Sequence, residues 1–217
     1  MFAQRLIKPE LMDHASPEVA RRSLEDLIRI NRHFGGHSVL KQMVSRVIPK
    51  DERFSLLDIG AASGDTARVL QSAYPGATIT SLDYNAVNLH RAPKPKVLGD
   101  AFALPFRPAS FDYVICALFL HHFTDDAVIG LLRNFYALAR CGLFVSDLQR
   151  SVFAYYFLPI TRLIYKWDWI TVHDGMISVR AAFRKRELVR LAREAGIPCP
   201  EARVHRPAFR IELIGRK

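Results

Sequence analysis

Apolar residues recur along this chain with two different periods, and the change between them divides the chain into parts. Within residues 20–28 they recur every three or four positions, with charged residues between them. This spacing predicts an amphipathic helix, with Ser16 as its N-cap, Pro17 in its first turn and an end near Gly35. A second, shorter helix is predicted at 38–47. Helices are therefore expected to come before any sheet.

From residue 54 onward, short apolar runs alternate with helical patterns. Such alternation predicts an α/β fold, a Rossmann-like and mostly parallel seven-stranded sheet with helices on both faces. The predicted strands are 54–59, 77–82, 96–99, 111–117, 142–147, 201–206 and 209–214, and the predicted helices are 64–73, 85–91, 125–139 and 184–195. The last two strands are expected to form an antiparallel hairpin at the sheet edge. We expect residues 1–217 to form a single domain, with the N-terminal helices within 10–50.

The alternation breaks between the fifth strand and residue 183, in a segment that is too long for an ordinary connection. Its aromatic residues are Phe153, Tyr155, Tyr156, Phe157, Tyr165, Trp167 and Trp169. We predict that 148–183 is a helical insertion that folds over the carboxyl ends of the strands. Open α/β sheets bind their ligands at that edge.

Composition narrows the class of protein. Half of the residues are hydrophobic (50%) and 24% are charged, as in a soluble globular protein. Three widely spaced cysteines argue against a disulfide scaffold or a structural zinc site and suit a reducing compartment. The first ten residues carry no apolar signal segment, so a cytoplasmic location is expected. The net charge of +10 favours anionic partners, but the charges are dispersed, so a soluble cationic surface explains them equally well.

The most specific motif lies in residues 56–65, where an apolar run ends in Asp58 and turns through Gly60 and Gly64 into a predicted helix. Glycines at such a turn let the backbone come close to a ligand. Dinucleotide-binding loops instead carry G-x-G-x-x-G. A carboxylate two residues before the first glycine would repel a pyrophosphate but suits a ligand with an ammonium and a sulfonium group. This motif resembles motif I of the class I S-adenosylmethionine (SAM) dependent methyltransferases.

Further motifs extend the resemblance. Asp83 follows the second strand, where the family has an acid that binds both ribose hydroxyls, and Tyr84 would then lie against the adenine. Asp100 and Ala101 match the family motif that contacts the adenine edge, and 111–116 resembles motif IV, the strand whose end faces the methyl group. The resemblance implies that SAM is the cofactor and S-adenosylhomocysteine the product. It implies cofactor contacts at Asp58, Gly60, Ala61, Gly64, Asp83, Tyr84, Asp100, Ala101 and Cys116.

Methyl transfer from SAM is an in-line displacement that depends mainly on alignment, and a base helps when the acceptor is a hydroxyl. His121 and His122 directly follow the fourth strand and are the candidate catalytic residues; packing is the alternative role. The aromatic insertion suits an apolar acceptor or a contact with a membrane surface, unless its rings simply form core. Tyr155, Tyr156 and Arg150 are the candidate substrate residues.

The overall pattern is similar to ubiquinone/menaquinone-type and related bacterial small-molecule methyltransferases, well over 54–147 and only in outline beyond. The resemblance implies an aromatic, polyketide- or quinone-like acceptor and a role in secondary metabolism. The net charge leaves an RNA methyltransferase as an alternative, although the Asn/Asp-Pro-Pro-aromatic motif is missing after the fourth strand. A non-catalytic SAM-binding regulator or partner subunit is a further alternative. No His/Asp/Glu spacing predicts a metal site, and the sequence leaves the oligomeric state open.

Overall fold

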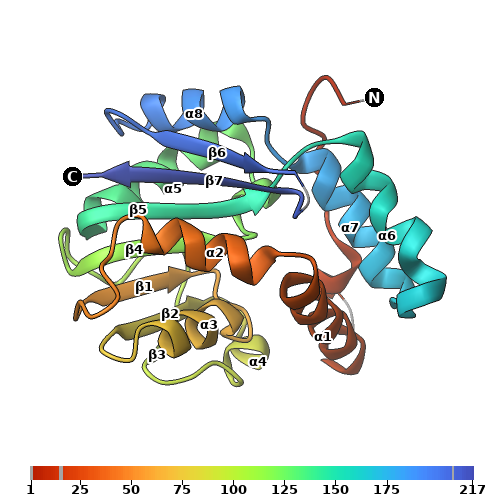
Figure 1. The fold of residues 1–217 in the computed structure, drawn as a ribbon, viewed down its shortest axis with the longest axis horizontal. Coiled ribbons are helices and arrows are strands. Elements are labelled where there is room, and N and C mark those ends of the chain that lie inside the picture. Colours follow the sequence, from red (N-terminus) through yellow and green to blue (C-terminus); the bar gives the residue numbers. More distant parts are fainter. Residues whose placement is uncertain (1, 15–16, 207) are drawn as a thin grey trace.

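A seven-stranded sheet runs through the computed structural model, which describes residues 2–14, 17–206 and 208–217 (Figure 1). The strand order is β3-β2-β1-β4-β5-β7-β6, and β7 alone runs antiparallel to its neighbours. The strands are β1 Ser55–Ile59, β2 Thr78–Asp83, β3 Lys96–Leu98, β4 Phe111–Ala117, β5 Ala139–Leu148, β6 Glu201–His205 and β7 Arg210–Arg216. The predicted α/β fold with an antiparallel hairpin edge is confirmed.

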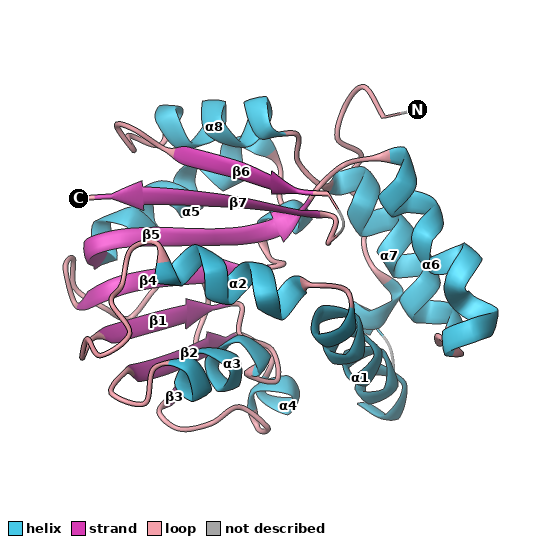
Figure 2. Ribbon diagram, viewed as in Figure 1, coloured by secondary structure: helices cyan, strands magenta, loops and turns pink. Residues whose placement is uncertain are grey.

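Helices cover both faces of this sheet (Figure 2). The helices are α1 Pro17–His33, α2 Gly36–Ser45, α3 Asp65–Ala73, α4 Ala86–Leu89, α5 Asp125–Leu138, α6 Val152–Tyr165, α7 Trp169–Ala181 and α8 Lys185–Glu194, with 3-10 turns η1 Leu11–His14 and η2 Leu120–His122. On one face, Met43 of α2 and Leu70 of α3 pack against the sheet. On the other, Phe135 of α5 and Leu188 of α8 do so. Because both faces are covered, β1 and β4 carry consecutive buried apolar residues, such as Leu56 and Leu57 or Val114 to Cys116, rather than alternating.

The predicted element boundaries hold with small shifts. Thr124 caps α5 by accepting from the Ala127 N–H. The helix α4 begins one residue later than predicted because Asn85 is its N-cap, whose side chain accepts from two N–H groups, and it ends two residues earlier. The fifth strand, β5, starts at Ala139, three residues early. The predicted N-cap Ser16 lies outside the described residues.

The insertion forms two helices, α6 and α7, beyond the carboxyl ends of the parallel strands (Figure 1). The N-terminal segment 2–14 joins them there, and Arg5 anchors it. The Arg5 guanidinium bonds to Asp125 and to backbone carbonyls of His121, Phe123 and Ala181. None of the described helices combines the length and apolar character that crossing a membrane requires.

Candidate functional site

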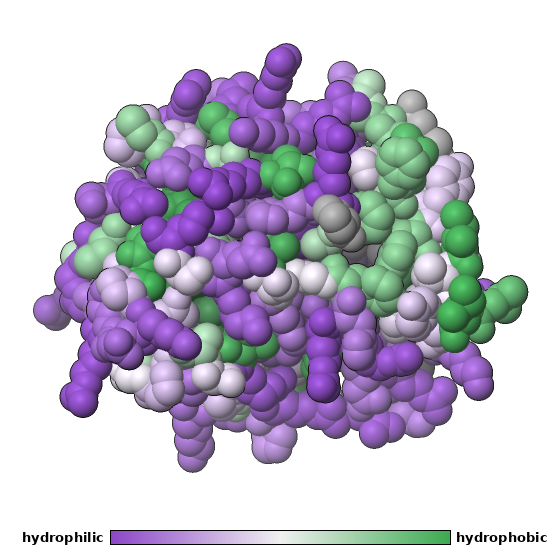
Figure 3. Space-filling view, viewed as in Figure 1, coloured by the Kyte–Doolittle hydropathy of each residue, from purple (hydrophilic) through white to green (hydrophobic). Residues whose placement is uncertain are grey.

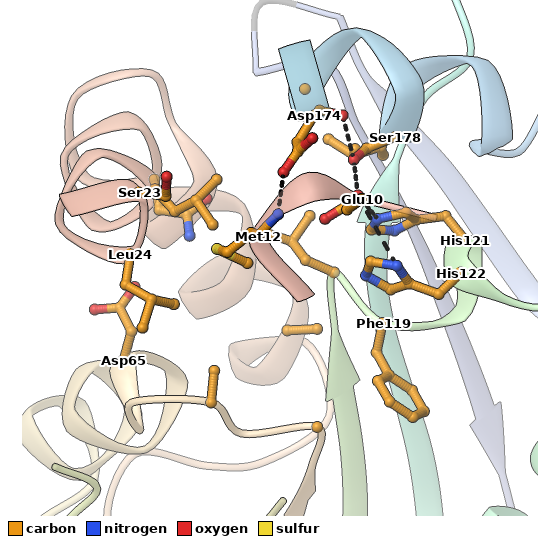
Figure 4. Close-up of a pocket in the computed structure, with 18 of the residues that line it drawn as sticks. Glu10, Met12, Ser23, Leu24, Asp65, Phe119, His121, His122, Asp174 and Ser178 are labelled. Atoms are coloured by element: carbon orange, nitrogen blue, oxygen red, sulfur yellow. Dashed lines mark hydrogen bonds and ion pairs between the residues drawn. The ribbon is translucent and has the colours of Figure 1, made fainter. Parts of the chain in front are cut away.

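A cavity of about 940 Å³ lies at the carboxyl ends of the strands. Its floor consists of the loops that follow β1, β2, β3 and β4, and its walls come from α1, α6, α7 and the N-terminal segment. Figure 4 shows a part of it, with α1 facing the histidine loop across the space. Parallel strands bring their carboxyl ends to one edge, so residues far apart in sequence meet here.

The glycine loop after β1 has the backbone that its sequence predicts, but neighbouring side chains of the protein also require glycine there. Gly60 and Gly64 have φ values of 71° and 76°, which favour glycine. A Cβ at Gly60 would lie 2.4 Å from the Phe119 ring, and one at Gly64 would lie 2.6 Å from Pro93. The glycines therefore make room for protein side chains. Gly60 also lines the cavity.

Asp58 is a buried carboxylic acid beneath this loop. Its side chain is enclosed, and Oδ2 has no hydrogen-bond partner among the described residues. Burial, together with the nearby charges of Asp83 and Asp65, raises the pKa of Asp58 to about 8. An unpaired buried carboxyl group of this kind calls for a cationic ligand group nearby.

Asp83 at the end of β2 lines the cavity and is held in one orientation. Its Oδ2 accepts from the Ala62 N–H at 2.7 Å, and its Oδ1 accepts from the Asn85 N–H at 2.8 Å. Burial raises the pKa of Asp83, and these N–H groups partly oppose that rise. Tyr84 beside it is 69% exposed.

Four other predicted cofactor residues can now be placed. Ala61, Asp100 and Ala101 line the cavity, and Asp100 accepts from the Phe102 N–H at 2.9 Å. Cys116 is 1% exposed, belongs to the apolar core against α5, and is not among the described residues that line the cavity. Its predicted cofactor contact is corrected accordingly, because its side chain points to the helical layer.

His121 lies between two carboxylates (Figure 4). Its Nδ1 is 2.6 Å from Asp147 Oδ1, and its Nε2 is 3.8 Å from Glu10 Oε1. Burial disfavours the imidazolium ion, but the charge and hydrogen bond of Asp147, with Glu10, outweigh burial and raise the pKa of His121 to about 9. His121 is therefore cationic at neutral pH and holds no free lone pair for a proton.

His122 lies beside it in the opposite state. The two rings have centroids 4.2 Å apart at an interplanar angle of 33°. Burial and the positive charge of His121 lower the pKa of His122 to about 4. His122 is therefore neutral at physiological pH and, of the two histidines, is the one able to accept a proton.

Glu10 is the site residue that sequence reasoning missed. It is 6% exposed, and Ser178 of α7 donates a hydrogen bond to its Oε1. The Asp174 carboxylate accepts from the Leu11 and Met12 N–H groups, both at 2.9 Å, and so holds this segment in place. Burial raises the pKa of Glu10, but interactions with His121 and His122 and the hydrogen bond from Ser178 together lower it by more, so the pKa lies below its usual value. No local pattern marks Glu10, since its partners lie more than a hundred residues away.

Glu10, His121 and His122 place three potential metal-ligand atoms within 4.8 Å of one another. Imidazole nitrogens bind a metal in the plane of the ring. The His121 Nδ1 already bonds to Asp147 and its Nε2 faces Glu10, so a network of charges and hydrogen bonds engages these atoms.

The three predicted substrate residues lie away from the cavity. Arg150 is buried behind it, where it forms an ion pair with Glu187 and bonds to a backbone carbonyl. Tyr155 packs against Phe2 and Tyr156. All three assignments are corrected: Arg150 precedes α6 and is held by its ion pair, and helical periodicity turns residues of α6 other than Tyr155 and Tyr156 inward. Those that line the cavity are Ala154, Phe157 and Leu158.

Comparisons with known proteins agree with this geometry. Residues 57–143 match the family model of a methyltransferase domain. A demethylmenaquinone methyltransferase of Thermotoga maritima is 31% identical over 105 residues, and one of Roseiflexus sp. is 34% identical over 101 residues. These matches cover 46% and 43% of this chain and 46% and 41% of the relatives, so less than half of either relative is matched.

The fold agrees over a longer span. The plantazolicin methyltransferase, solved with a substrate analogue and SAH, has a TM-score of 0.68 at 13% identity, over 92% of this chain and 89% of the other. This likeness concerns the fold alone. The chain is therefore similar to methyltransferase domains over residues 57–143, and its fold is similar to that of solved methyltransferases over a longer span.

Proposed function

We propose that this protein transfers the methyl group of SAM to a small, largely apolar acceptor. One observation carries the proposal: a single cavity joins a polar end, formed by strand-end carboxylates, to an apolar end beneath α1 and α6. Only part of each curated relative is matched, so the proposals for the activity and the acceptor rest on the geometry of the site.

The polar end fits SAM by the chemistry of its groups. Asp83 offers carboxylate oxygens to two ribose hydroxyls, and Tyr84 and Asp100 border the space for the adenine. Asp58 is not among the described residues that line the cavity; it lies buried beneath the glycine loop, and its carboxylate form, favoured by the ligand ammonium group, would act on that group from there. When bound, SAM supplies an electrophilic methyl group on a cationic sulfur. S-adenosylhomocysteine is the product that leaves.

The other end of the cavity favours an apolar acceptor. Met12, Leu24, Leu27, Phe157 and Leu158 contribute to its walls. Apolar walls with a few convergent polar groups are typical of small-molecule sites. A quinone-like or other aromatic acceptor, including a polyketide-like product of secondary metabolism, fits these walls and agrees with the names of the curated relatives. The exposed outer face of α6 suits an acceptor that is held in a membrane.

His122 and Glu10 supply the acid–base groups for a hydroxyl acceptor. Neutral His122 accepts the hydroxyl proton as the oxygen attacks, and the Glu10 carboxylate, 3.9 Å from His122 Nδ1, stabilises the imidazolium ion that forms. His121, locked by Asp147, keeps a positive charge behind the reacting oxygen. This arrangement does not need a metal ion.

Binding of SAM at pH 7 is expected to release about one proton, because Asp58 with a pKa near 8 is mostly protonated and the ligand ammonium favours the carboxylate. Calorimetry in buffers of different ionisation enthalpy measures this release. The Asp58→Asn variant is the control and should release none from this site. Proton uptake, or a wild-type value equal to that of the variant, contradicts the assignment of Asp58.

The function is tested with methyl-labelled SAM and an extract of the host cells. Label in the organic-soluble fraction supports a small apolar acceptor. Nuclease-sensitive label in the acid-precipitated fraction would support the RNA methyltransferase, which the net charge of +10 keeps as the second candidate. Tight SAM binding without any transfer would support a non-catalytic regulator or partner subunit.

The same assay, repeated on separated soluble and membrane fractions of the extract, shows which fraction contains the acceptor. Cys116, Cys141 and Cys199 are all free thiols, which fits the proposed cytoplasmic location.

A further inference from the structure

The helix α6 is apolar on two opposite sides. Its inner residues Ala154, Phe157 and Leu158 line the cavity. Its outer side carries large apolar side chains that are largely exposed: Phe153 is 81% exposed, Ile160 72%, Leu163 90% and Ile164 75%. A soluble protein normally turns one face of such a helix to water with polar side chains.

The outer residues form one continuous stripe. Positions 153, 156, 160, 163 and 164 recur at intervals of three or four, so they share one face of the helix. Figure 3 shows hydrophobic atoms gathered at the right-hand edge of the molecule, where Figure 1 places α6. Trp169, which is 54% exposed at the start of α7, lies near the end of the stripe. Contiguous apolar surface of this kind marks a contact site.

Basic residues lie near the C-terminal end of the stripe. Arg162 is the single charged residue within α6, and Lys166 follows the helix directly; both are exposed. Arg29 of α1 donates to the Tyr165 carbonyl but is paired with Asp26 at 3.0 Å, so it adds no net charge. The nearest acid along the chain, Asp168, caps α7 and offsets one of the two remaining basic residues. The net charge at this end of the stripe is therefore positive but small.

We propose that the outer face of α6 docks into the interface of an anionic lipid bilayer. A helix of 14 residues is too short to span, so it lies in the plane of the membrane with its apolar stripe among the upper acyl chains. The basic residues meet lipid phosphates. This inference deepens the proposed function and rests on it for one point, that the acceptor passes from the bilayer past α6 into the cavity.

The charge of the whole chain selects the bilayer over a second copy of this protein as the occupant. Each copy carries +10, so two copies repel one another, whereas an anionic surface attracts each of them. The stripe and the cavity wall also belong to one helix. Docking therefore places the apolar end of the cavity next to the lipid phase.

The test measures co-sedimentation of the SAM-free protein with two kinds of vesicle, phosphatidylcholine alone and phosphatidylcholine mixed with phosphatidylglycerol. We expect binding to the anionic vesicles, weakened by added salt. The double variant Leu163→Ser/Ile164→Ser should lower the partition coefficient at least about tenfold. The double variant Arg162→Gln/Lys166→Gln should lower it about 25-fold on anionic vesicles, since each basic residue contributes about fivefold.

Matched controls lie elsewhere on the surface. Leu98→Ser removes an apolar side chain that is 60% exposed on the edge strand β3, and Lys41→Gln removes an exposed charge on α2. Neither should change the partition coefficient. All these side chains are exposed, so thermal unfolding should be close to that of the wild type.

Several results would overturn the inference. These are absence of binding to anionic vesicles, equal binding by the Leu163→Ser/Ile164→Ser variant, or a dimer in sedimentation equilibrium that this variant dissociates. Vesicle binding needs neither SAM nor an acceptor. If the vesicles are bound and no extract component is methylated, the docking surface stands and the proposed function fails.

Discussion

The Asp83→Asn variant is expected to bind SAM about 100-fold more weakly than the wild type, because two charge-assisted hydrogen bonds to ribose hydroxyls are lost, each worth about 1.5 kcal/mol or more. The side chain is already fixed by the Ala62 and Asn85 N–H groups, so the wild type spends no further entropy in orienting it. Asparagine keeps one acceptor oxygen and presents an amide donor to the other N–H group. Isothermal titration calorimetry with SAM measures the change.

Two comparisons make the Asp83 result specific. Asp51→Asn, at an exposed position far from the cavity, should leave the affinity unchanged. Thermal unfolding without ligand shows whether the loop after β2 is still formed. A folded Asp83→Asn protein with wild-type affinity would remove Asp83 from the cofactor site.

The Asp147→Asn variant is expected to lose about 3 kcal/mol of unfolding free energy, since removal of one partner of a buried ion pair leaves the other uncompensated. Asp147 and His121 are both enclosed, 2.6 Å apart. The cost stays at the lower end of the usual range because His121 can give up its proton. Urea unfolding near neutral pH measures the loss. The surface pair of Asp112 and Arg140 provides a control, and Asp112→Asn should cost less than about 1 kcal/mol.

The same substitution changes how stability depends on pH. The pKa of His121 rises from 6.5 in the unfolded chain to about 9 in the folded one. The stability that this rise contributes is fully present below pH 6.5 and is lost as the pH increases through about 9. In Asp147→Asn the pH dependence of the unfolding free energy that comes from His121 should disappear. The raised pKa of Asp58 also makes the protein lose stability as the pH increases, up to about pH 8. The Asp147→Asn substitution leaves this contribution of Asp58 unchanged.

NMR titration of the two histidines separates this network from simple packing. In Asp147→Asn the pKa of His121 should fall well below 9, and that of His122 should rise above 4 because its cationic neighbour is gone. Unchanged titration of both rings would contradict the network, whatever the effect on stability.

Most of the fold could be predicted because its signals are local. The apolar run of β1, the glycine turn and the helix α3 lie within twenty residues, and their periods differ clearly. The helix boundary differs from the prediction where a side chain caps the helix, as at Asn85, whose side-chain oxygen accepts from the first N–H groups of α4. The antiparallel β6–β7 hairpin could be predicted for the same reason, because two short strands flank one turn.

The site was predictable only where it follows the order of the strands. Asp83 ends β2 and Asp100 follows the end of β3, so the sheet brings them to one edge. Cys116 was misplaced because a strand that is buried on both sides gives no alternation to tell which face a side chain takes. The α6 residues were misjudged for a related reason: aromatic content says nothing about which side of a helix faces inward. Glu10 depends on contacts across the whole chain, and no sequence period encodes these.

The attachment of η1 to α7 implies an order of assembly. Leu11 donates to Asp174 across a sequence separation of 163 residues. Closing so long a loop is slow, and during synthesis it must wait until α7 has left the ribosome. The strand-end carboxylates need only the middle of the chain. A newly made molecule is therefore expected to acquire its cofactor pocket first and its acceptor wall last, so that it can hold SAM before it is competent to use it.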